Sequence, residues 1–186
     1  MKKKKRPSIK TERLRLQPYT LEDAPDLQRL IGERDVAATL LNVPYPYEDG
    51  MAEEWISKHQ KRFDKEEAVE FAIVDGKEGF LMGTIGIERI NKEYENAEIG
   101  YWIALPYWGN GYCTEAAQAV IKYGFEVLGL HRIYAQHFTS NPASGRIMQK
   151  IGMKYEGCLR QNVKKWGRFE NMAFYGILKS EYNKTT

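Results

Sequence analysis

Alternation of polar and apolar positions predicts strands along much of the chain. In the segment 13–17, leucines alternate with polar residues, as in a strand with one buried face. The runs 70–74, 81–90 and 97–104 are separated by short polar turns, which predicts an antiparallel meander. The remaining strands are predicted at 132–138, 155–163 and 169–178, the last two as a hairpin around Trp166 and Gly167.

Apolar residues that recur every three or four positions predict helices between these strands. The clearest helix follows Gly111 and reaches Leu128, with Gly129 at its end. Another helix begins with Asn141 as the N-cap and Pro142 at the first helical position. Two further helices are predicted at 21–31 and 49–63, the second as two pieces or one bent helix.

This order of elements predicts the fold class. Strands and helices mix around one sheet, which is an α+β arrangement. A length of 186 residues fits one domain, and the sequence contains no internal repeat or low-complexity segment. We therefore expect a single domain at residues 11–182, preceded by a short arm at residues 1–10.

The net charge of +3 is unevenly distributed. Residues 1–10 carry six basic and no acidic side chains, so the rest of the chain is net acidic at −3. An acidic body argues against a general nucleic-acid binder. We expect a flexible, solvated arm; the alternative is an arm that adds affinity for RNA or another polyanion.

Other features of the composition narrow the class of protein. No apolar run reaches the roughly 18–20 residues of a membrane span, and no apolar segment follows the basic N-terminus as in a secretory signal. A cytoplasmic protein is therefore expected. The two cysteines, Cys113 and Cys158, and the three histidines show no disulfide framework and no metal-ligand spacing, so no metal site is predicted.

The segment Gly109-Asn110-Gly111 lies between a predicted buried strand and the long helix. A glycine loop that opens a helix gathers unpaired backbone N–H groups, and the helix dipole adds positive potential. Such a loop is a phosphate site built from main chain. The alternative is an ordinary strand-to-helix turn.

Several linked motifs favour the phosphate site. They are Ala97–Trp102, Trp108–Ala116, His131–Ile133, Asn141–Ser144, Lys150–Gly152 and Glu156-Gly157. From about 13 to 178 the chain resembles the GNAT acetyltransferase superfamily, most of all the branch with the bacterial ribosomal-protein N-terminal acetyltransferases (the RimJ and RimL group). The resemblance implies a mixed, mostly antiparallel sheet with helices on both faces and a splayed strand pair that holds acetyl-CoA.

The resemblance also implies the cofactor contacts. The pyrophosphate would bind backbone amides of the loop and first turn, at Trp108, Gly109, Asn110, Gly111, Tyr112, Cys113 and Thr114. The pantetheine arm would add to the strand end at Trp102, Ile103 and Ala104. Asn141 and Ser144 would face the thioester. Trp108 and Cys113 depart from the broad family pattern; Cys113 is either a small packing residue or a reactive thiol near a helix start.

Two residues are candidates for proton transfer. In the resembled family the serine is proposed to protonate the leaving thiolate, which assigns that role to Ser144. Glu98 is the candidate base, acting through water, and Glu88 is a weaker one. Val163 stands where some relatives of this family carry a carboxylate, so that base is absent here. Its absence favours an α-amine acceptor, because an α-amine has a pKa of about 8 and requires little help from a base.

The function expected is acetyl-CoA-dependent N-acetylation of a primary amine by direct attack in a ternary complex. The first choice of acceptor is the N-terminal α-amine of a ribosomal protein, with the basic arm as a docking aid on rRNA. The alternatives are a small amine (polyamine, amino acid or antibiotic), or a non-catalytic acetyl-CoA-binding or RNA-associated domain. No acidic cluster in the sequence marks a polyamine pocket, and a monomer and a homodimer both stay open.

Overall fold

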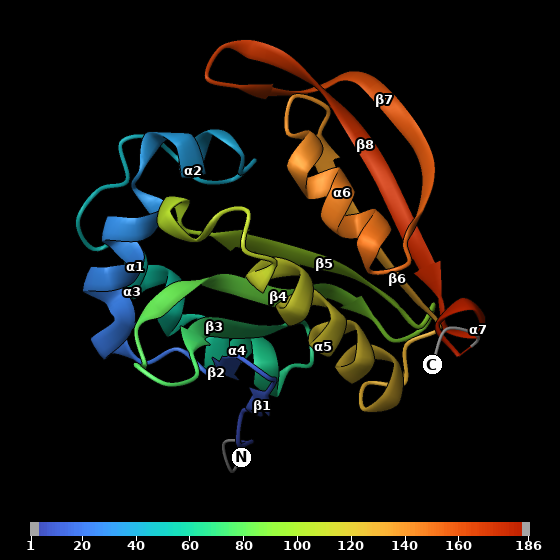
Figure 1. Cartoon of the computed structure of the whole chain (residues 1–186), viewed down its shortest axis with the longest axis horizontal. Helices are drawn as coiled ribbons and strands as arrows, with labels where there is room; N and C mark the ends of the chain where they lie inside the picture. Colours follow the sequence, from blue (N-terminus) through green and yellow to red (C-terminus); the bar gives the residue numbers. More distant parts are fainter. Residues whose placement is uncertain (1–3, 184–186) are drawn as a thin grey trace.

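The computed structural model describes residues 4–183 and contains an eight-stranded sheet with helices on both faces (Figure 1). The order of strands across the sheet is β1-β2-β3-β4-β5-β6-β8-β7. The strands are β1 Ile9–Lys10, β2 Leu14–Gln17, β3 Val69–Asp75, β4 Leu81–Asn91, β5 Asn96–Ile103, β6 Arg132–Phe138, β7 Lys154–Lys165 and β8 Arg168–Leu178. This sheet confirms the predicted α+β class.

The helices connect the strands in the predicted order, with some additions. The α-helices are α1 Ala24–Ile31, α2 Arg34–Ala38, α3 Met51–Ser57, α4 His59–Asp64, α5 Tyr112–Glu126, α6 Pro142–Lys150 and α7 Lys179–Tyr182. Short 3-10 turns occur at Leu21–Asp23 and Leu105–Tyr107. The predicted helix at 49–63 is two helices, α3 and α4, as one of its two readings expected. The short helices α2 and α7 were not predicted.

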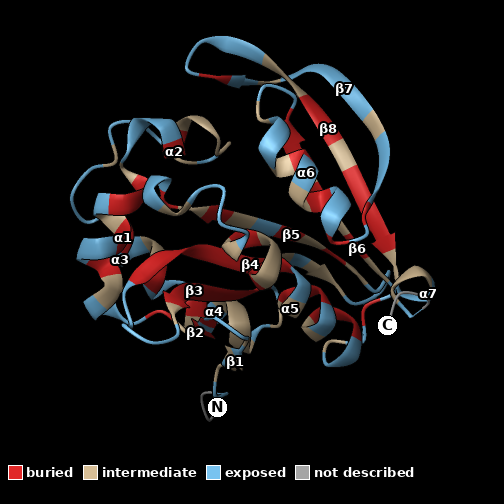
Figure 2. Cartoon of the chain, in the orientation of Figure 1, coloured by how far each residue is buried: buried red, intermediate tan, exposed pale blue. Residues whose placement is uncertain are grey.

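Two apolar clusters cover the two faces of the sheet (Figure 2). Along β3, Phe71 and Ile73 face the cluster formed with α5 and α6, whereas Ala72 and Val74 face the cluster formed with α1 and α3. Successive side chains of a strand point to opposite faces, so a strand covered on both sides is apolar throughout. This explains why the central strands read as apolar runs in the sequence.

The sheet opens in its centre, between β5 and β6. Among the described strands this pair alone is parallel, and its pairing ends at Glu98 and Tyr134. β5 nevertheless continues to Ile103 and β6 to Phe138, so the two strands separate beyond their first residues. The predicted splayed strand pair is therefore confirmed, and the wedge that it leaves is the site considered next.

Residues 4–10 lie against the domain, where a flexible arm was predicted. β1 pairs with β2, and the Arg6 guanidinium donates a hydrogen bond of 2.6 Å to the Tyr19 carbonyl. The prediction is wrong for this part of the arm, because the edge of β2 and a buried carbonyl provide partners that a count of charges does not reveal. The remainder of the predicted arm, residues 1–3, lies outside the described residues.

Candidate active site

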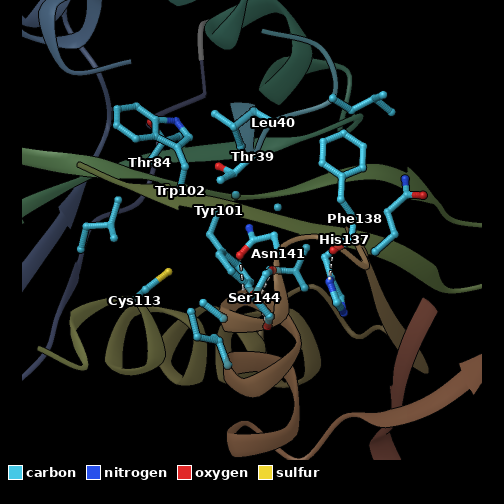
Figure 3. Close-up of a pocket in the computed structure, with 18 of the residues that line it drawn as sticks. Thr39, Leu40, Thr84, Tyr101, Trp102, Cys113, His137, Phe138, Asn141 and Ser144 are labelled. Carbon is cyan, nitrogen blue, oxygen red and sulfur yellow. Dashed lines mark hydrogen bonds between the residues drawn. The ribbon is translucent and has the colours of Figure 1, made fainter. Parts of the chain in front are cut away.

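A cavity of about 600 Å³ occupies the wedge between β5 and β6 (Figure 3). The starts of α5 and α6 line one side of it, with Cys113 and Ser144 among the lining residues. The segment 39–43, which follows α2, lines the opposite side, where Thr39 and Leu40 are seen in Figure 3. The cavity therefore passes through the opened sheet from one face to the other.

The loop before α5 has the geometry of an anion site. Gly109 and Gly111 have φ angles of +77° and +78°, in the left-handed region that favours glycine. The first intrahelical bond runs from the Glu115 N–H to the Gly111 carbonyl at 3.1 Å, which leaves the N–H groups of residues 112–114 without acceptors inside the helix. Together with the dipole of this 15-residue helix, these amides favour a phosphate group.

Arg13, which precedes β2, braces the outer side of this loop. Its Nη1 donates to the Asn110 carbonyl at 3.1 Å, its Nε pairs with Glu115 at 2.7 Å, and its guanidinium lies 4.4 Å from the centre of the Tyr112 ring. The Asn110 side chain in turn donates to the Trp108 carbonyl at 3.0 Å. Asn110 lies outside the cavity lining, and its side chain stabilises the loop.

At the end of β5, the backbone groups of Ala104 have partners within the protein. The Ala104 N–H donates to the Met82 carbonyl at 2.8 Å, and the Ala104 carbonyl accepts from the Tyr107 N–H at 3.0 Å. Ala104 is not among the residues that line the cavity, so its predicted contact with the cofactor stays a prediction. Because backbone groups alternate between the two edges of a strand, those of Tyr101 and Ile103 point toward the wedge instead.

Trp108 acts through its indole side chain, while its backbone N–H, predicted to bind the pyrophosphate, donates to the Leu105 carbonyl at 3.2 Å. Its indole Nε1 donates to the Ile103 carbonyl at 2.7 Å and so fixes the phosphate loop to the end of β5. The Ile103 N–H and the backbone of Tyr101 then face the wedge, where an extended ligand could add as a further strand. Trp102 belongs to the other face, where its side chain is buried in the cluster with α1 and α3 and also lines the cavity.

Ser144 and Tyr101 form a pair of hydroxyl groups in the wedge (Figure 3). The Ser144 Oγ donates to the Tyr101 hydroxyl at 3.2 Å, and that hydroxyl donates to the Ser144 carbonyl at 3.1 Å. The Asn141 side chain caps α6 and accepts from the Ser144 N–H at 3.4 Å, as its N-cap position predicts. Burial raises the pKa of Tyr101, so its phenol keeps its proton near neutral pH.

Cys113 is a buried packing residue. Its side chain is 6 % exposed, and burial raises the pKa of the thiol to about 12. The thiolate is the reactive form, so this cysteine is inert near neutral pH. Of the two readings of Cys113, the structure therefore favours the small packing residue over the reactive thiol.

Two carboxylates line the cavity on the face opposite α5, and they lie beside each other in the register of β4 and β5. Glu98 accepts from the Gln136 Nε2 at 2.9 Å and pairs with Arg89 at 3.0 Å. Glu88 pairs with Arg62 at 3.2 Å, and the same guanidinium also pairs with the buried Glu70. Each carboxylate therefore has a basic partner, which reduces the net negative charge that the cavity presents.

Two glycines form the floor of the cavity between these carboxylates and Trp102. Gly86 and Gly100 lie opposite each other on β4 and β5, and both line the cavity. A Cβ atom at Gly100 would meet no atom of the described residues within 4 Å, whereas one at Gly86 would lie 2.9 Å from the Val69 carbonyl. The space above Gly100 is thus open and can take part of a ligand.

Of the three histidines, one lines the cavity. His59 is buried away from the cavity, and His131 is exposed at the start of β6. The His137 ring lies at the cavity wall and packs against Gly145 of α6.

Among residues 4–183 no three side chains of His, Cys, Asp or Glu group as metal ligands. In the same range, no helix has the length and apolar character to cross a membrane.

A family model described as an acetyltransferase (GNAT) domain matches residues 13–154 of the chain. The chain belongs to the GNAT acetyltransferase family. It is 31 % identical over 175 residues to an uncharacterized N-acetyltransferase, p20, of Bacillus licheniformis, covering 94 % of this chain and 98 % of that protein. A crystal structure of a GNAT acetyltransferase from Bacillus anthracis matches with a TM-score of 0.83 and 28 % identity, covering 94 % of this chain and all of that one.

Relatives of this GNAT domain are named for different acceptors. The spermidine N(1)-acetyltransferase of Vibrio cholerae is 26 % identical over 84 % of this chain and 87 % of its own length. The ribosomal-protein-serine acetyltransferase of Escherichia coli is 35 % identical over 46 % of this chain and 48 % of its own length. Similarity to these proteins therefore identifies the reaction, an acetyl transfer to an amine, without identifying the acceptor.

The residues present fit acetyl-CoA, the acyl donor of GNAT acetyltransferases. The amides of residues 112–114 suit its pyrophosphate, and the backbone edge at Tyr101 and Ile103 suits the amide groups of its pantetheine arm. The wedge leads from both of these to the hydroxyl of Ser144. Acetyl-CoA is anionic at one end and peptide-like in the middle, so the order of its parts matches the order of these protein groups along the wedge.

Sequence reasoning missed several residues that shape this site. Arg13, Tyr101 and Gln136 act through partners that are distant in the chain, such as Glu115 for Arg13 and Ser144 for Tyr101. None of them forms a local pattern that would mark it. The cross-strand register of β4 and β5 could have paired Glu88 with Glu98, since the two strands were predicted as neighbours.

Proposed function

We propose that this enzyme transfers the acetyl group of acetyl-CoA to the N-terminal α-amine of a ribosomal protein in the cytoplasm. Acetyl-CoA supplies an activated thioester. The protein holds it by the amides of residues 112–114 and the edge of β5, and admits the amine from the face that carries Glu88 and Glu98. The ribosomal-protein-serine acetyltransferase of Escherichia coli among the relatives supports this choice of acceptor.

The choice of a peptide N-terminus as the acceptor rests on the ion pairs at the acceptor side of the cavity. Glu98 pairs with Arg89, and Glu88 shares Arg62 with the buried Glu70, so the negative charge that the cavity presents to a polycation is reduced. A single α-amine, with a pKa of about 8, is partly neutral near neutral pH and needs only a weak base. A peptide N-terminus therefore suits this cavity better than a multiply charged amine.

The residues of the wedge divide the proton transfers between them. Ser144 stands at the start of α6 with its hydroxyl in the wedge, where it can give a proton to the departing thiolate and regain one from water. Tyr101, hydrogen-bonded to it at 3.2 Å, holds that hydroxyl in place. Glu98 takes the amine proton through water, after its carboxylate releases Gln136 or Arg89.

A contact between the basic N-terminal segment and rRNA belongs to the same proposal. Lys5 and Lys10 are exposed, while Arg6 is engaged with the domain. Exposed lysines add affinity for phosphates that falls as salt rises. Replacing both lysines by alanine would then weaken acetylation of ribosome-bound acceptor at low salt, while turnover of a free peptide would stay the same.

A small polyamine is the second candidate acceptor, because a spermidine N(1)-acetyltransferase aligns with 84 % of the chain and because two carboxylates face the cavity. The test is thiol release from acetyl-CoA with three acceptors: peptides that carry ribosomal-protein N-termini, the same peptides with a blocked N-terminus and an internal lysine, and spermidine. Mass spectrometry then locates the acetyl group.

The proposal expects turnover of the free N-terminal peptides alone, with a lower kcat in Ser144→Ala. Turnover of spermidine in preference to every peptide would replace the acceptor while leaving the acetyl transfer intact. Turnover of the blocked peptides at the internal lysine would instead indicate a lysine acetyltransferase and contradict the proposal.

A further inference from the structure

Lys165 is a buried lysine outside the groups that hold acetyl-CoA. It is the last residue of β7, near the tip of the β7–β8 hairpin, and it is 8 % exposed. Its Nζ donates to the carbonyls of Leu40 and Val43, each at 2.6 Å. These two residues lie more than 120 positions away in the chain, within the segment 39–43 that lines the cavity.

An ammonium group is costly to bury unless hydrogen bonds replace its water. Here burial lowers the pKa of Lys165, and two main-chain carbonyls compensate the charge. The segment 39–43 has no regular secondary structure, so its carbonyls have no ladder of N–H groups to bind. The ammonium thus supplies the donors that hold this segment in one conformation.

Trp166 provides a second contact at the same place. Its ring lies 5.5 Å from the ring of Tyr45 and 5.7 Å from the guanidinium of Arg34, measured between centres. Arg34 begins α2, and Tyr45 follows the segment 39–43, so the hairpin tip contacts the chain on both sides of that segment. In Figure 1 the tip of the hairpin reaches over the wedge toward α2.

These contacts join the two halves of the opened sheet. The segment 39–43 packs with α1 and α3 on the β2–β5 half, through Leu40 and Val43, whereas β7 and β8 continue the half that begins with β6. The segment 39–43 forms a roof over the acceptor side of the cavity, and the hairpin tip ties this roof to the other half of the sheet.

We propose that Lys165 is a positioning residue for the acceptor: it holds the segment 39–43 as the roof of the acceptor side, so that only an amine at the end of a narrow, flexible chain reaches the thioester. This inference rests on the proposed function only in requiring an amine acceptor. The inference goes beyond the proposed function because it excludes lysines on the surface of a folded protein as acceptors. Such a lysine would have to bring a broad protein surface under the roof.

The test compares Lys165→Met with Lys164→Met in the full chain. Methionine keeps the length of the stem but removes the ammonium, and Lys164 is an exposed neighbour whose Nζ lies 5.4 Å from the centre of the Phe169 ring. The acceptor is whichever amine the wild type acetylates. Lys165→Met should raise the KM for that acceptor at least tenfold and change the Kd for coenzyme A less than twofold. Lys164→Met should change neither.

Two further measurements distinguish a role of Lys165 in positioning the acceptor from a role in the stability of the fold alone. Lys165→Arg, which restores two donors, should recover part of the lost acceptor affinity. Amide hydrogen exchange of Lys165→Met should speed up in residues 39–43 and stay the same in α5, a measurement that needs no acceptor. The inference is overturned if the acceptor KM stays within twofold of the wild type, if the Kd for coenzyme A rises equally, or if exchange in residues 39–43 does not change.

Discussion

Arg13 and Glu115 lie 102 positions apart in the chain and form an ion pair of 2.7 Å beside the phosphate loop. The Arg13 N–H and the Thr11 hydroxyl also donate to this carboxylate, at 2.8 and 2.6 Å. Glu115 lies in the first turn of α5, where a negative charge is favoured by the helix dipole. The start of the domain thereby fixes the helix end that receives the cofactor.

Arg13→Met should therefore weaken binding of coenzyme A. The variant loses the ion pair and the bond to the Asn110 carbonyl, so the loop samples conformations whose amides no longer converge. We expect a rise in the Kd for coenzyme A of about tenfold, or roughly 1.4 kcal/mol, in isothermal titration calorimetry. Arg15→Met is the matched control, since Arg15 lies two positions further along, on β2, and contacts the Gln17 side chain. Equal effects of the two substitutions would rule out a specific brace.

Ser144→Ala should lower kcat and leave the KM for acetyl-CoA nearly unchanged. General acid catalysis contributes typically 10²–10⁴-fold, and a thiolate leaves readily, so a loss of about tenfold to a hundredfold is expected. Tyr101→Phe should lower kcat less, because it removes the partner of the Ser144 hydroxyl but not the hydroxyl itself. Steady-state kinetics with the best acceptor test both. A kcat in Ser144→Ala equal to that of the wild type would exclude Ser144 as the acid.

Gly100→Leu should block the acceptor without unfolding the protein. A side chain at this position would extend on the same face as Glu98 and Trp102, into space where a Cβ meets no described atom within 4 Å. We expect the acceptor KM to rise more in Gly100→Leu than in Gly100→Ala, with an unchanged melting temperature. If both variants kept the wild-type KM, the acceptor would have to bind elsewhere.

A thiol reagent should modify Cys158 and spare Cys113. Cys158 is exposed, whereas burial raises the pKa of the Cys113 thiol to about 12. Mass spectrometry after treatment at pH 7.5 should find one label in the folded wild type, none in Cys158→Ser, and two in the wild type unfolded in urea. Labelling of folded Cys158→Ser would show that Cys113 is more accessible than its burial indicates.

Acid should destabilise the fold through His59. This ring is fully buried, 4.1 Å from the Trp55 ring, and burial together with the nearby Arg6 and Arg62 lowers its pKa to about 3. The neutral form is favoured in the folded state, so the stability that it contributes is complete above pH 6.5 and is lost as the pH falls toward 3. By linkage, the contribution of His59 to the free energy of unfolding should fall by about 2 kcal/mol between pH 8 and pH 5.

His59→Phe should remove this pH dependence, because it keeps an aromatic ring and cannot take up a proton. Urea unfolding of the wild type and the variant at pH 8 and pH 5 tests it. Burial raises the pKa of Glu70 to about 7, and its effect on stability has the opposite sign. Subtracting the change in the free energy of unfolding of the variant from that of the wild type cancels this contribution. His131→Phe, at an exposed position, is the control and should behave as the wild type does. The same change in stability between pH 8 and pH 5 in the wild type and in His59→Phe would refute the role of His59.

Local patterns in the sequence determined the strands, the main helices and the phosphate loop. The period of apolar residues reports which face of an element is buried, and Gly111 and Asn141 begin the helices α5 and α6 where the sequence placed them. Such signals depend on residues close together in the chain. They therefore survive without any knowledge of the tertiary structure.

Tertiary structure decided what no local pattern encodes. The wedge exists because β5 and β6 pair only as far as Glu98, and its roof exists because the β7–β8 hairpin brings Lys165 to Leu40. Residues 4–10 dock, and the carboxylates of the cavity are balanced by Arg62 and Arg89, through partners distant in sequence. A hydrogen bond or ion pair between distant residues depends on how the whole chain folds, so only the assembled domain could show it.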